Sequence, residues 1–159
     1  MKIMVTGHRD IQSYDQLYNF FYSRLKPGHT YISGMALGTD IAFAEAIRDR
    51  RLPLIAAVPN INQAAKWKAQ DQLLYSNLLD YARECGQVVQ VDLLEKYKSK
   101  TYVQSLFARN RWMVDQSEFA IVIWDGRKSG GTYHALQLIQ KKAISGVIIN
   151  PNTFEEKRF

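Results

Sequence analysis

The chain has 159 residues, of which 47% are hydrophobic and 23% charged, a balance that indicates a folded globular protein and excludes disorder. A chain of this length fits one domain with a single core. Its one cysteine, Cys85, excludes an internal disulfide and gives no zinc-binding pattern. The formal net charge of +6 favours anionic partners without naming one.

No apolar run approaches the roughly 18 residues that a membrane-spanning helix needs, and the first run, from Ile3, is too short for a signal peptide. We therefore expect a cytoplasmic protein without membrane contact. Residues 1–150 are expected to form the domain. Residues 151–159 are a short C-terminal tail of mixed charge that we expect to fray.

Apolar runs of strand length alternate with amphipathic segments of helix length along the chain. The pattern predicts strands at residues 3–6, 30–33, 54–58, 88–91, 119–124 and 147–149. It predicts helices at residues 14–25, 39–50, 63–82, 103–115 and 133–143, and a mobile, lysine-rich loop at 93–101. Regular β-α alternation indicates a single Rossmann-like, doubly wound α/β domain, with a mainly parallel sheet and helices on both faces.

Two of the predicted strands lead into helices through glycine-containing loops. The first is Ser33-Gly34-Met35-Ala36-Leu37-Gly38-Thr39-Asp40, and the second runs from Asp125-Gly126 to Ser129-Gly130-Gly131-Thr132. Glycine lets the backbone approach a ligand closely, and the free N–H groups of a helix's first turn point at any anion bound there. Two such loops predict a ligand with two anchoring points, as a nucleotide has. The structural alternative is a tight turn in each, with Thr39 or Thr132 as helix N-cap.

Neither loop has the G-x-G-x-x-G spacing of dinucleotide-binding folds, and the G-x-x-x-x-G-K-[ST] motif of P-loop NTPases is absent. In doubly wound sheets, ligands bind at the carboxyl ends of the strands, where the strand order reverses. Four segments fall at such ends and are expected on one rim. They are Thr6-Gly7-His8-Arg9, the two glycine loops and Pro59-Asn60.

Several polar residues on this rim are candidates for ligand contacts. His8 and Arg9 place a titratable donor and a fixed cation directly after the first strand. For His8, a backbone hydrogen bond is the simpler interpretation. Asp125 could accept a hydrogen bond from a ribose hydroxyl, whereas Asp40 could serve only to complement its helix N-terminus.

The predicted helix at 103–115 carries a polar amide on its apolar side. That side consists of Val103, Phe107, Met113 and Val114. We expect Asn110, which lies among them, to hydrogen-bond a neighbouring loop or a ligand. Arg111 and Asp115 are four residues apart and are expected to pair with each other. Arg109 is then free, at a partly exposed position, to contact an anion.

The order and spacing of five motifs resemble the YpsA-like branch of the SLOG superfamily, which groups Rossmann-like domains of the DprA DNA-processing proteins and the LOG phosphoribohydrolases. The motifs are Thr6-Gly7-His8-Arg9, the segment from Ser33 to Asp40, Ala65-Lys66-Trp67, the segment from Arg109 to Asp115, and Ser129-Gly130-Gly131-Thr132. The resemblance runs from Lys2 to about Ile149. It implies a domain that binds nucleotides or nucleotide-derived ligands at the two glycine loops, as ligand-sensing domains of this superfamily do.

The sequence departs from the LOG enzymes at their motif P-G-G-x-G-T-x-x-E. When Gly131-Thr132 is aligned on its Gly-Thr, Ala135 stands where the LOG glutamate would be. Cleavage of an N-glycosidic bond needs a carboxylate near the anomeric carbon, and only Asp40, Glu45 or Asp125 could replace it. The sequence therefore favours binding without rapid turnover and identifies no catalytic residue.

The resulting prediction is a sensor or sequestering module that binds a nucleotide-type small molecule and requires no cofactor or metal. The alternatives are a nucleotide N-glycosidase and a DprA-like binder of single-stranded nucleic acid, and a homo-oligomer is left open. The predicted ligand-binding residues are Thr6, Gly7, His8, Arg9, Ser33, Gly34, Met35, Ala36, Gly38, Thr39, Asp40, Arg109, Asn110, Asp125, Gly126, Ser129, Gly130, Gly131 and Thr132.

Overall fold

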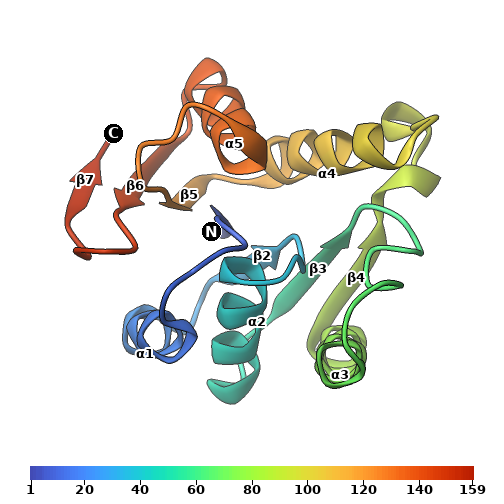
Figure 1. Ribbon diagram of the computed structural model, residues 1–159, viewed down its shortest axis with the longest axis horizontal. Helices are drawn as coiled ribbons and strands as arrows, with labels where there is room; N and C mark the ends of the chain where they lie inside the picture. Colours follow the sequence, from blue (N-terminus) through green and yellow to red (C-terminus); the bar gives the residue numbers. More distant parts are fainter.

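The computed structural model describes residues 1–159, which form a seven-stranded sheet between two layers of helices (Figure 1). The strands are β1 (Lys2–Gly7), β2 (Thr30–Ser33), β3 (Leu54–Val58), β4 (Gly86–Gln90), β5 (Phe119–Ile123), β6 (Ser145–Ile149) and β7 (Glu156–Arg158). Their order across the sheet is β4-β3-β2-β1-β5-β6-β7, and every neighbouring pair is parallel except β6 and β7. The predicted Rossmann-like, doubly wound fold is confirmed.

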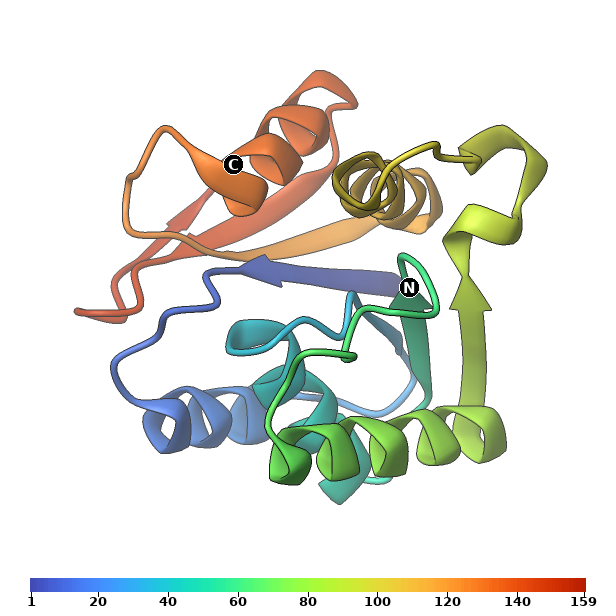
Figure 2. The same cartoon turned by 45° about the vertical axis from the view of Figure 1, so that its right-hand side comes forward.

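Helices cover both faces of this sheet, as Figure 2 shows from the side. One layer contains α1 (Tyr14–Arg24), α2 (Thr39–Asp49) and α3 (Ala69–Cys85). The other contains α4 (Tyr102–Gln116) and α5 (Gly130–Lys141). No helix combines the length and the apolar character that crossing a membrane requires.

The strand order reverses between β1 and β5. From β1 the chain moves outward through β2, β3 and β4, and α4 then carries it back to β5 on the other side of β1 (Figure 1). Residues Ile3 to Gly7 of β1 pair in register with Phe119 to Ile123 of β5. The carboxyl ends of these two strands therefore form the crevice where folds of this class bind ligands.

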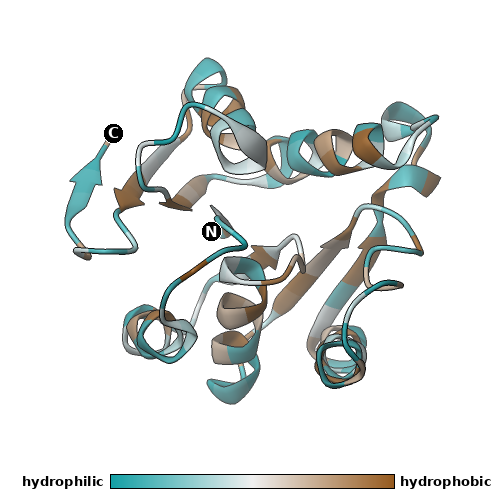
Figure 3. Ribbon diagram, in the orientation of Figure 1, coloured by the Kyte–Doolittle hydropathy of each residue, from teal (hydrophilic) through white to brown (hydrophobic).

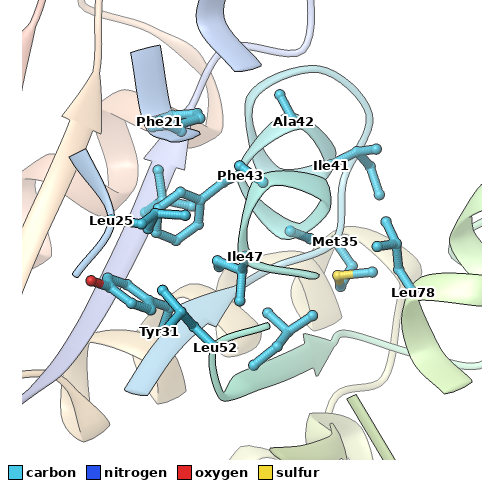
Figure 4. Packing of buried hydrophobic residues seen from close by; sticks show 14 of the residues in the cluster. Phe21, Leu25, Tyr31, Met35, Ile41, Ala42, Phe43, Ile47, Leu52 and Leu78 are labelled. Atoms are coloured by element: carbon cyan, nitrogen blue, oxygen red, sulfur yellow. The ribbon is translucent and has the colours of Figure 1, made fainter. Parts of the chain in front are cut away.

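Each helical layer packs on its own side of the sheet. The larger apolar cluster has 20 buried residues, among them Phe21 and Phe43, whose rings meet edge to face with centroids 4.9 Å apart (Figure 4). A second cluster of 15 buried residues lies beneath α4 and α5. Because neighbouring strand residues point to opposite faces, Val5 joins the first cluster and Met4 the second. Figure 3 shows the resulting pattern of apolar strands between helices with hydrophilic outer faces.

The long predicted helix at 63–82 is wrong at its start. Residues 61–66 form turns, and α3 begins only at Ala69. The turns are stabilised by side chains: Asn60 Oδ1 accepts a hydrogen bond from the Asn62 N–H at 2.8 Å, and Gln63 Nε2 donates to the Gly34 carbonyl at 3.2 Å. These polar contacts compete with helix formation at the beginning of the segment.

Two further expectations outside the site also differ. The C-terminal tail pairs as β7 with β6, and Phe159 exchanges two backbone hydrogen bonds with Gly146 at 3.1 and 3.2 Å. A short 3-10 helix, η1 (Val91–Leu93), ends at the first residue of the lysine-rich loop, the loop contains a second one, η2 (Glu95–Tyr97), and the Tyr97 side chain is buried. Both segments are therefore held by specific contacts.

Candidate functional site

A cavity of about 420 Å³ opens at the carboxyl ends of β1 and β5, where the strand order reverses. Its walls come from the end of β1, from both glycine loops and from the middle of α4. Sixteen residues line it: Thr6, Gly7, His8, Arg9, Asp10, Ala36, Asp40, Leu106, Phe107, Arg109, Asn110, Arg127, Ser129, Gly130, Gly131 and Thr132. Both glycine loops therefore lie on the same rim, as the sequence predicts.

Two consecutive residues of α4 connect the two glycine loops. Arg109 Nη1 donates a hydrogen bond to the Gly34 carbonyl in the first loop. Asn110 Nδ2 reaches the Gly131 carbonyl in the second loop and His134 Nδ1, each at 3.3 Å. Asn110 thus supports a loop, which is one of the two roles that the sequence leaves open for it. The hydrogen bonds of Arg109 and Asn110 therefore link both loops to the same helix.

Arg109 is far more buried than the sequence suggests, with only 5% of its surface exposed. Its Nε donates to Asn110 Oδ1 at 3.2 Å, and no ion pair neutralises the guanidinium. Nη2 has no hydrogen-bond partner in the protein and is not fully enclosed. Burial lowers the pKa of the guanidinium, which nevertheless stays charged at neutral pH. The carboxylate of Asp40 is near enough to act on this charge and raises the pKa of the guanidinium, but it does not form an ion pair with it, so the cation on the cavity wall is only partly compensated.

Asp40 and Arg109 both lie close to Gly34. A Cβ atom on Gly34 would come within 2.7 Å of Arg109 Nη1 and 2.9 Å of Asp40 Oδ2, so a glycine is required here for close packing. Asp40 is 8% exposed, and its Oδ2 accepts from the Ala36 N–H at 3.3 Å. Burial raises the pKa of Asp40 to about 6, although the charge of Arg109 acts in the opposite direction.

Three residues of the first glycine loop, Ser33, Met35 and Thr39, are buried and have structural roles. Ser33 and Met35 are fully buried, and Ser33 Oγ donates to the Asp40 carbonyl at 2.8 Å. Thr39 does not cap α2 with its side chain, because its hydroxyl donates to the His8 carbonyl at 2.9 Å and Gly38 occupies the N-cap position. The N-cap prediction for Thr39 is therefore wrong.

The second glycine loop presents the N-terminus of α5 to the cavity. Ser129 is the N-cap residue, without a side-chain cap hydrogen bond, and the N-cap prediction for Thr132 is also wrong. Nothing lies within 4 Å of the position that a Cβ atom of Gly131 would occupy. Residues 129–132 line the cavity, so the start of α5 lies at the cavity wall, and helix N-termini are suited to anions.

His8, Asp125 and Arg127 form a polar group beside the cavity. His8 Nε2 accepts from the Asp125 N–H at 3.2 Å, which agrees with the backbone hydrogen bond expected for it, and lies 3.1 Å from Asp125 Oδ1. Burial, together with the charge of Arg127, lowers the pKa of His8. Arg127 Nε binds the Asp125 carboxylate at 2.8 Å. Asp125 is therefore already engaged by protein groups.

Twelve of the nineteen predicted ligand-binding residues line the cavity. The other seven are in the loops but not on the cavity wall: Ser33, Gly34, Met35, Gly38, Thr39, Asp125 and Gly126. Sequence reasoning missed Asp10, Leu106, Phe107 and Arg127. The position of Arg127 directly after Asp125-Gly126 was a signal that could have identified it.

The apolar side predicted for α4 is partly wrong. Val103 and Phe107 are exposed, and Phe107, which is 40% exposed, stands at the cavity with its ring 4.4 Å from that of His134. Arg111 does not pair with Asp115, whose carboxylate binds Lys142 and the Tyr97 hydroxyl. Leu106 and Phe107 of α4 and Ala36 of the first glycine loop are the three hydrophobic residues in the lining of an otherwise polar cavity.

The arrangement can bind an anion next to a flat apolar group. Arg9, Arg109 and the start of α5 supply positive potential, and no group of three or more potential metal-binding side chains is found. Ala135, at the position of the LOG glutamate, is fully buried in α5. Three carboxylates were candidates to replace that glutamate. Glu45 is bound by Tyr14 and Arg48, and neither Glu45 nor Asp125 lines the cavity. Of the three, Asp40 is the one on the cavity wall.

These features define a Rossmann-like domain with a mainly polar crevice at the reversal of its strand order. Residues 29–150 match the family model YpsA, described as the YspA SLOG family, and the chain belongs to this family. It is 31% identical over 113 residues to the uncharacterized SPbeta prophage-derived protein YoqJ of Bacillus subtilis (strain 168). The matched region covers 64% of each chain, so the protein spans less than two thirds of that relative.

Two solved structures of DNA processing protein A share the fold. The protein from Streptococcus pneumoniae superposes with a TM-score of 0.69 at 18% identity, over 93% of this chain and 50% of that protein. The protein from Helicobacter pylori, described for its single-stranded DNA binding mode, gives a TM-score of 0.67 at 19% identity, over 94% of this chain and 65% of that protein. At this identity the likeness establishes the fold alone.

Proposed function

We propose that the protein binds a nucleotide or a nucleotide-derived small molecule in the cavity between its two glycine loops. The observation that carries the proposal is the Arg109 guanidinium, which is buried at the cavity wall without a direct ion pair, although the nearby Asp40 carboxylate partly balances its charge. A phosphate placed between Arg109 and the start of α5 would add negative charge there and accept charge-assisted hydrogen bonds. Arg9, exposed on the same wall, would add a second cation.

The apolar side of the cavity supports a nucleotide over a bare phosphate. Phe107 offers an exposed aromatic face beside the cationic wall, and aromatic rings stack on nucleobases. Burial and the nearby charge of Arg111 lower the pKa of His134, the ring partner of Phe107, so that the pair is neutral and suited to a flat apolar surface. In this arrangement, the phosphate binds at the glycine loops and the base at α4.

Single-stranded nucleic acid is the second candidate, because the Helicobacter pylori neighbour is described as binding it. Calorimetry with nucleoside monophosphates and with oligothymidylates of increasing length separates the two candidates. The proposal predicts saturable binding of a monophosphate and only weak oligonucleotide binding that falls steeply with salt. Tight, length-dependent oligonucleotide binding at physiological salt would favour the second candidate.

Turnover of the ligand is expected to be slow or absent. Cleavage of an N-glycosidic bond needs a carboxylate at the anomeric carbon, and Ala135 replaces the glutamate of the LOG motif. Incubation with a panel of nucleoside monophosphates, followed by chromatography, should show little free base. Robust release of base would identify the protein as an N-glycosidase, and loss of that release in Asp40→Asn would assign the carboxylate.

A further inference from the structure

A second cavity of about 270 Å³ adjoins the candidate site. The two cavities share three lining residues, His8, Asp10 and Arg127. The second is completed by Ile11, Gln12, Asp125, Pro151 and Asn152, so its lining is almost entirely polar. None of the functional assignments above uses this space.

Arg127 separates the two cavities. Its Nη1 and Nη2 each bind one oxygen of Asp10 at 3.2 Å, and its Nε binds the two oxygens of Asp125 at 3.1 and 2.8 Å. Asp10 follows β1 and Asp125 follows β5. Arg127 therefore ties together the two loops that flank the strand-order reversal.

The ion pair between Arg127 and Asp10 can be broken at low cost. The Arg127 and Asp10 side chains are 46% and 72% exposed, and ion pairs between exposed groups contribute little to stability. Gly126 and Gly130 flank Arg127 with φ values of +99° and +86°, and nothing lies within 4 Å of their missing Cβ atoms. The Arg127 backbone is held by hydrogen bonds to Asp125 and Trp124, but its side chain is half exposed, so the guanidinium can rotate and a phosphate in the first cavity can compete with Asp10 for it.

The chemistry of the second cavity fits hydroxyl groups rather than a second anion. Asp10 and Asp125 would repel a phosphate but accept hydrogen bonds from hydroxyls. The amide side chains of Gln12 and Asn152, which have no partners in the protein, can both donate and accept. A sugar presents this combination of donors and acceptors.

We infer that Arg127 is a latch between the two cavities and that the ligand is a sugar nucleotide. Its phosphates draw Arg127 away from Asp10, and its terminal sugar occupies the second cavity against Asp10 and Asn152. The inference rests on the proposed function, because these phosphates belong to the nucleotide in the first cavity.

Calorimetry with matched pairs tests the inference: ADP against ADP-glucose, UDP against UDP-glucose, and GDP against GDP-mannose. For the nucleotide that binds, the sugar-bearing form should bind at least about tenfold more tightly, as expected for new hydrogen bonds to charged groups. Equal affinity within a pair would overturn the inference and leave the proposed function intact. Failure of all six compounds to bind would overturn both.

Two variants separate the latch from a merely structural role. In Asp10→Ala, the preference for the sugar-bearing form should disappear, while the diphosphate should bind a few-fold more tightly because Arg127 has no competing carboxylate. Asn152→Ala should weaken only the sugar-bearing form. Asp80→Asn, which removes an exposed carboxylate from α3 far from the site, is the matched control and should change neither affinity. A preference that persists in both Asp10→Ala and Asn152→Ala would overturn the inference.

Trp124 supplies a readout of the latch itself. Its Nε1 donates to the Arg127 carbonyl at 2.7 Å, so movement of Arg127 should alter its fluorescence. Adding the sugar-bearing ligand should change the emission of the wild type, and this change should be absent in Trp124→Phe. An identical change in both proteins would contradict movement at Arg127.

Discussion

At the residue scale, Arg109 contributes to both binding and stability. Because it is buried and hydrogen-bonded to the Gly34 carbonyl, Arg109→Ala should lower the free energy of unfolding by about 1.5–3 kcal/mol and reduce phosphate affinity about ten- to hundredfold. Thermal melts and calorimetry measure the two effects. Arg111→Ala, an exposed arginine on the same helix, is the control and should change neither by a comparable amount. Unchanged affinity in Arg109→Ala would place the ligand elsewhere.

Asp40 gives the domain a defined dependence on pH. Its folded-state pKa of about 6 exceeds the ordinary value of 3.8, so ionisation destabilises the fold: stability falls as pH rises from about 4 to 6, by on the order of 3 kcal/mol. Burial lowers the pKa values of His8 and His134, so these two residues make the free energy of unfolding rise as the pH increases towards 6.5. Both histidines are present in Asp40→Asn, so their contributions cancel when the free energy of unfolding of this variant is compared with that of the wild type.

Urea denaturation of both proteins between pH 4 and pH 8 measures that difference. Asp40→Asn should gain stability relative to the wild type across pH 4 to 6 and keep a constant advantage above it. For the same electrostatic reason, wild-type affinity for an anionic ligand should fall more steeply with rising pH than that of Asp40→Asn. Parallel stability curves would show that Asp40 does not titrate in this range.

At the element scale, the two glycine loops differ in what their glycines do. Gly34 is surrounded by Arg109 and Asp40, whereas Gly131 faces open space. Gly34→Val should therefore reduce both stability and affinity, and Gly131→Val should retain the melting temperature but lose affinity, because its side chain enters the space of the phosphate. Melting curves and calorimetry on both variants provide the test. Full affinity in Gly131→Val would mean that the second loop is only a turn.

Much of the element pattern could be predicted from the sequence because strands buried on both faces read as continuous apolar runs. Strands β2 and β3 match their predicted bounds, and α2 differs only at its last residue. The start of α3 could not be predicted, since the hydrogen bonds of Asn60 and Gln63 that replace its first turns are tertiary contacts. The pairing of β7 with β6 is tertiary too.

The site was harder to predict in its side chains than in its loops. Backbone segments at strand ends must converge on one rim, so the loops follow from the fold. The burial of Arg109 and the exposure of Phe107 depend on where α4 crosses the sheet. Helical periodicity predicts the opposite, with Arg109 partly exposed and Phe107 on the apolar side of the helix. The contacts of Arg127 with Asp10 join residues 117 positions apart, which local sequence cannot reveal.

At the scale of the whole molecule, the chain places its main polar cavity, lined by Arg9 and Arg109, at the single reversal of its strand order. Whether a nucleotide binds there can be measured by chemical-shift mapping with NMR during titration with a nucleoside monophosphate. We expect saturable shifts of the backbone amides of Gly7 to Asp10 and Gly130 to Thr132 and of the Arg109 side chain. Shifts confined to other surfaces, or no shifts at millimolar nucleotide, would contradict the proposed function.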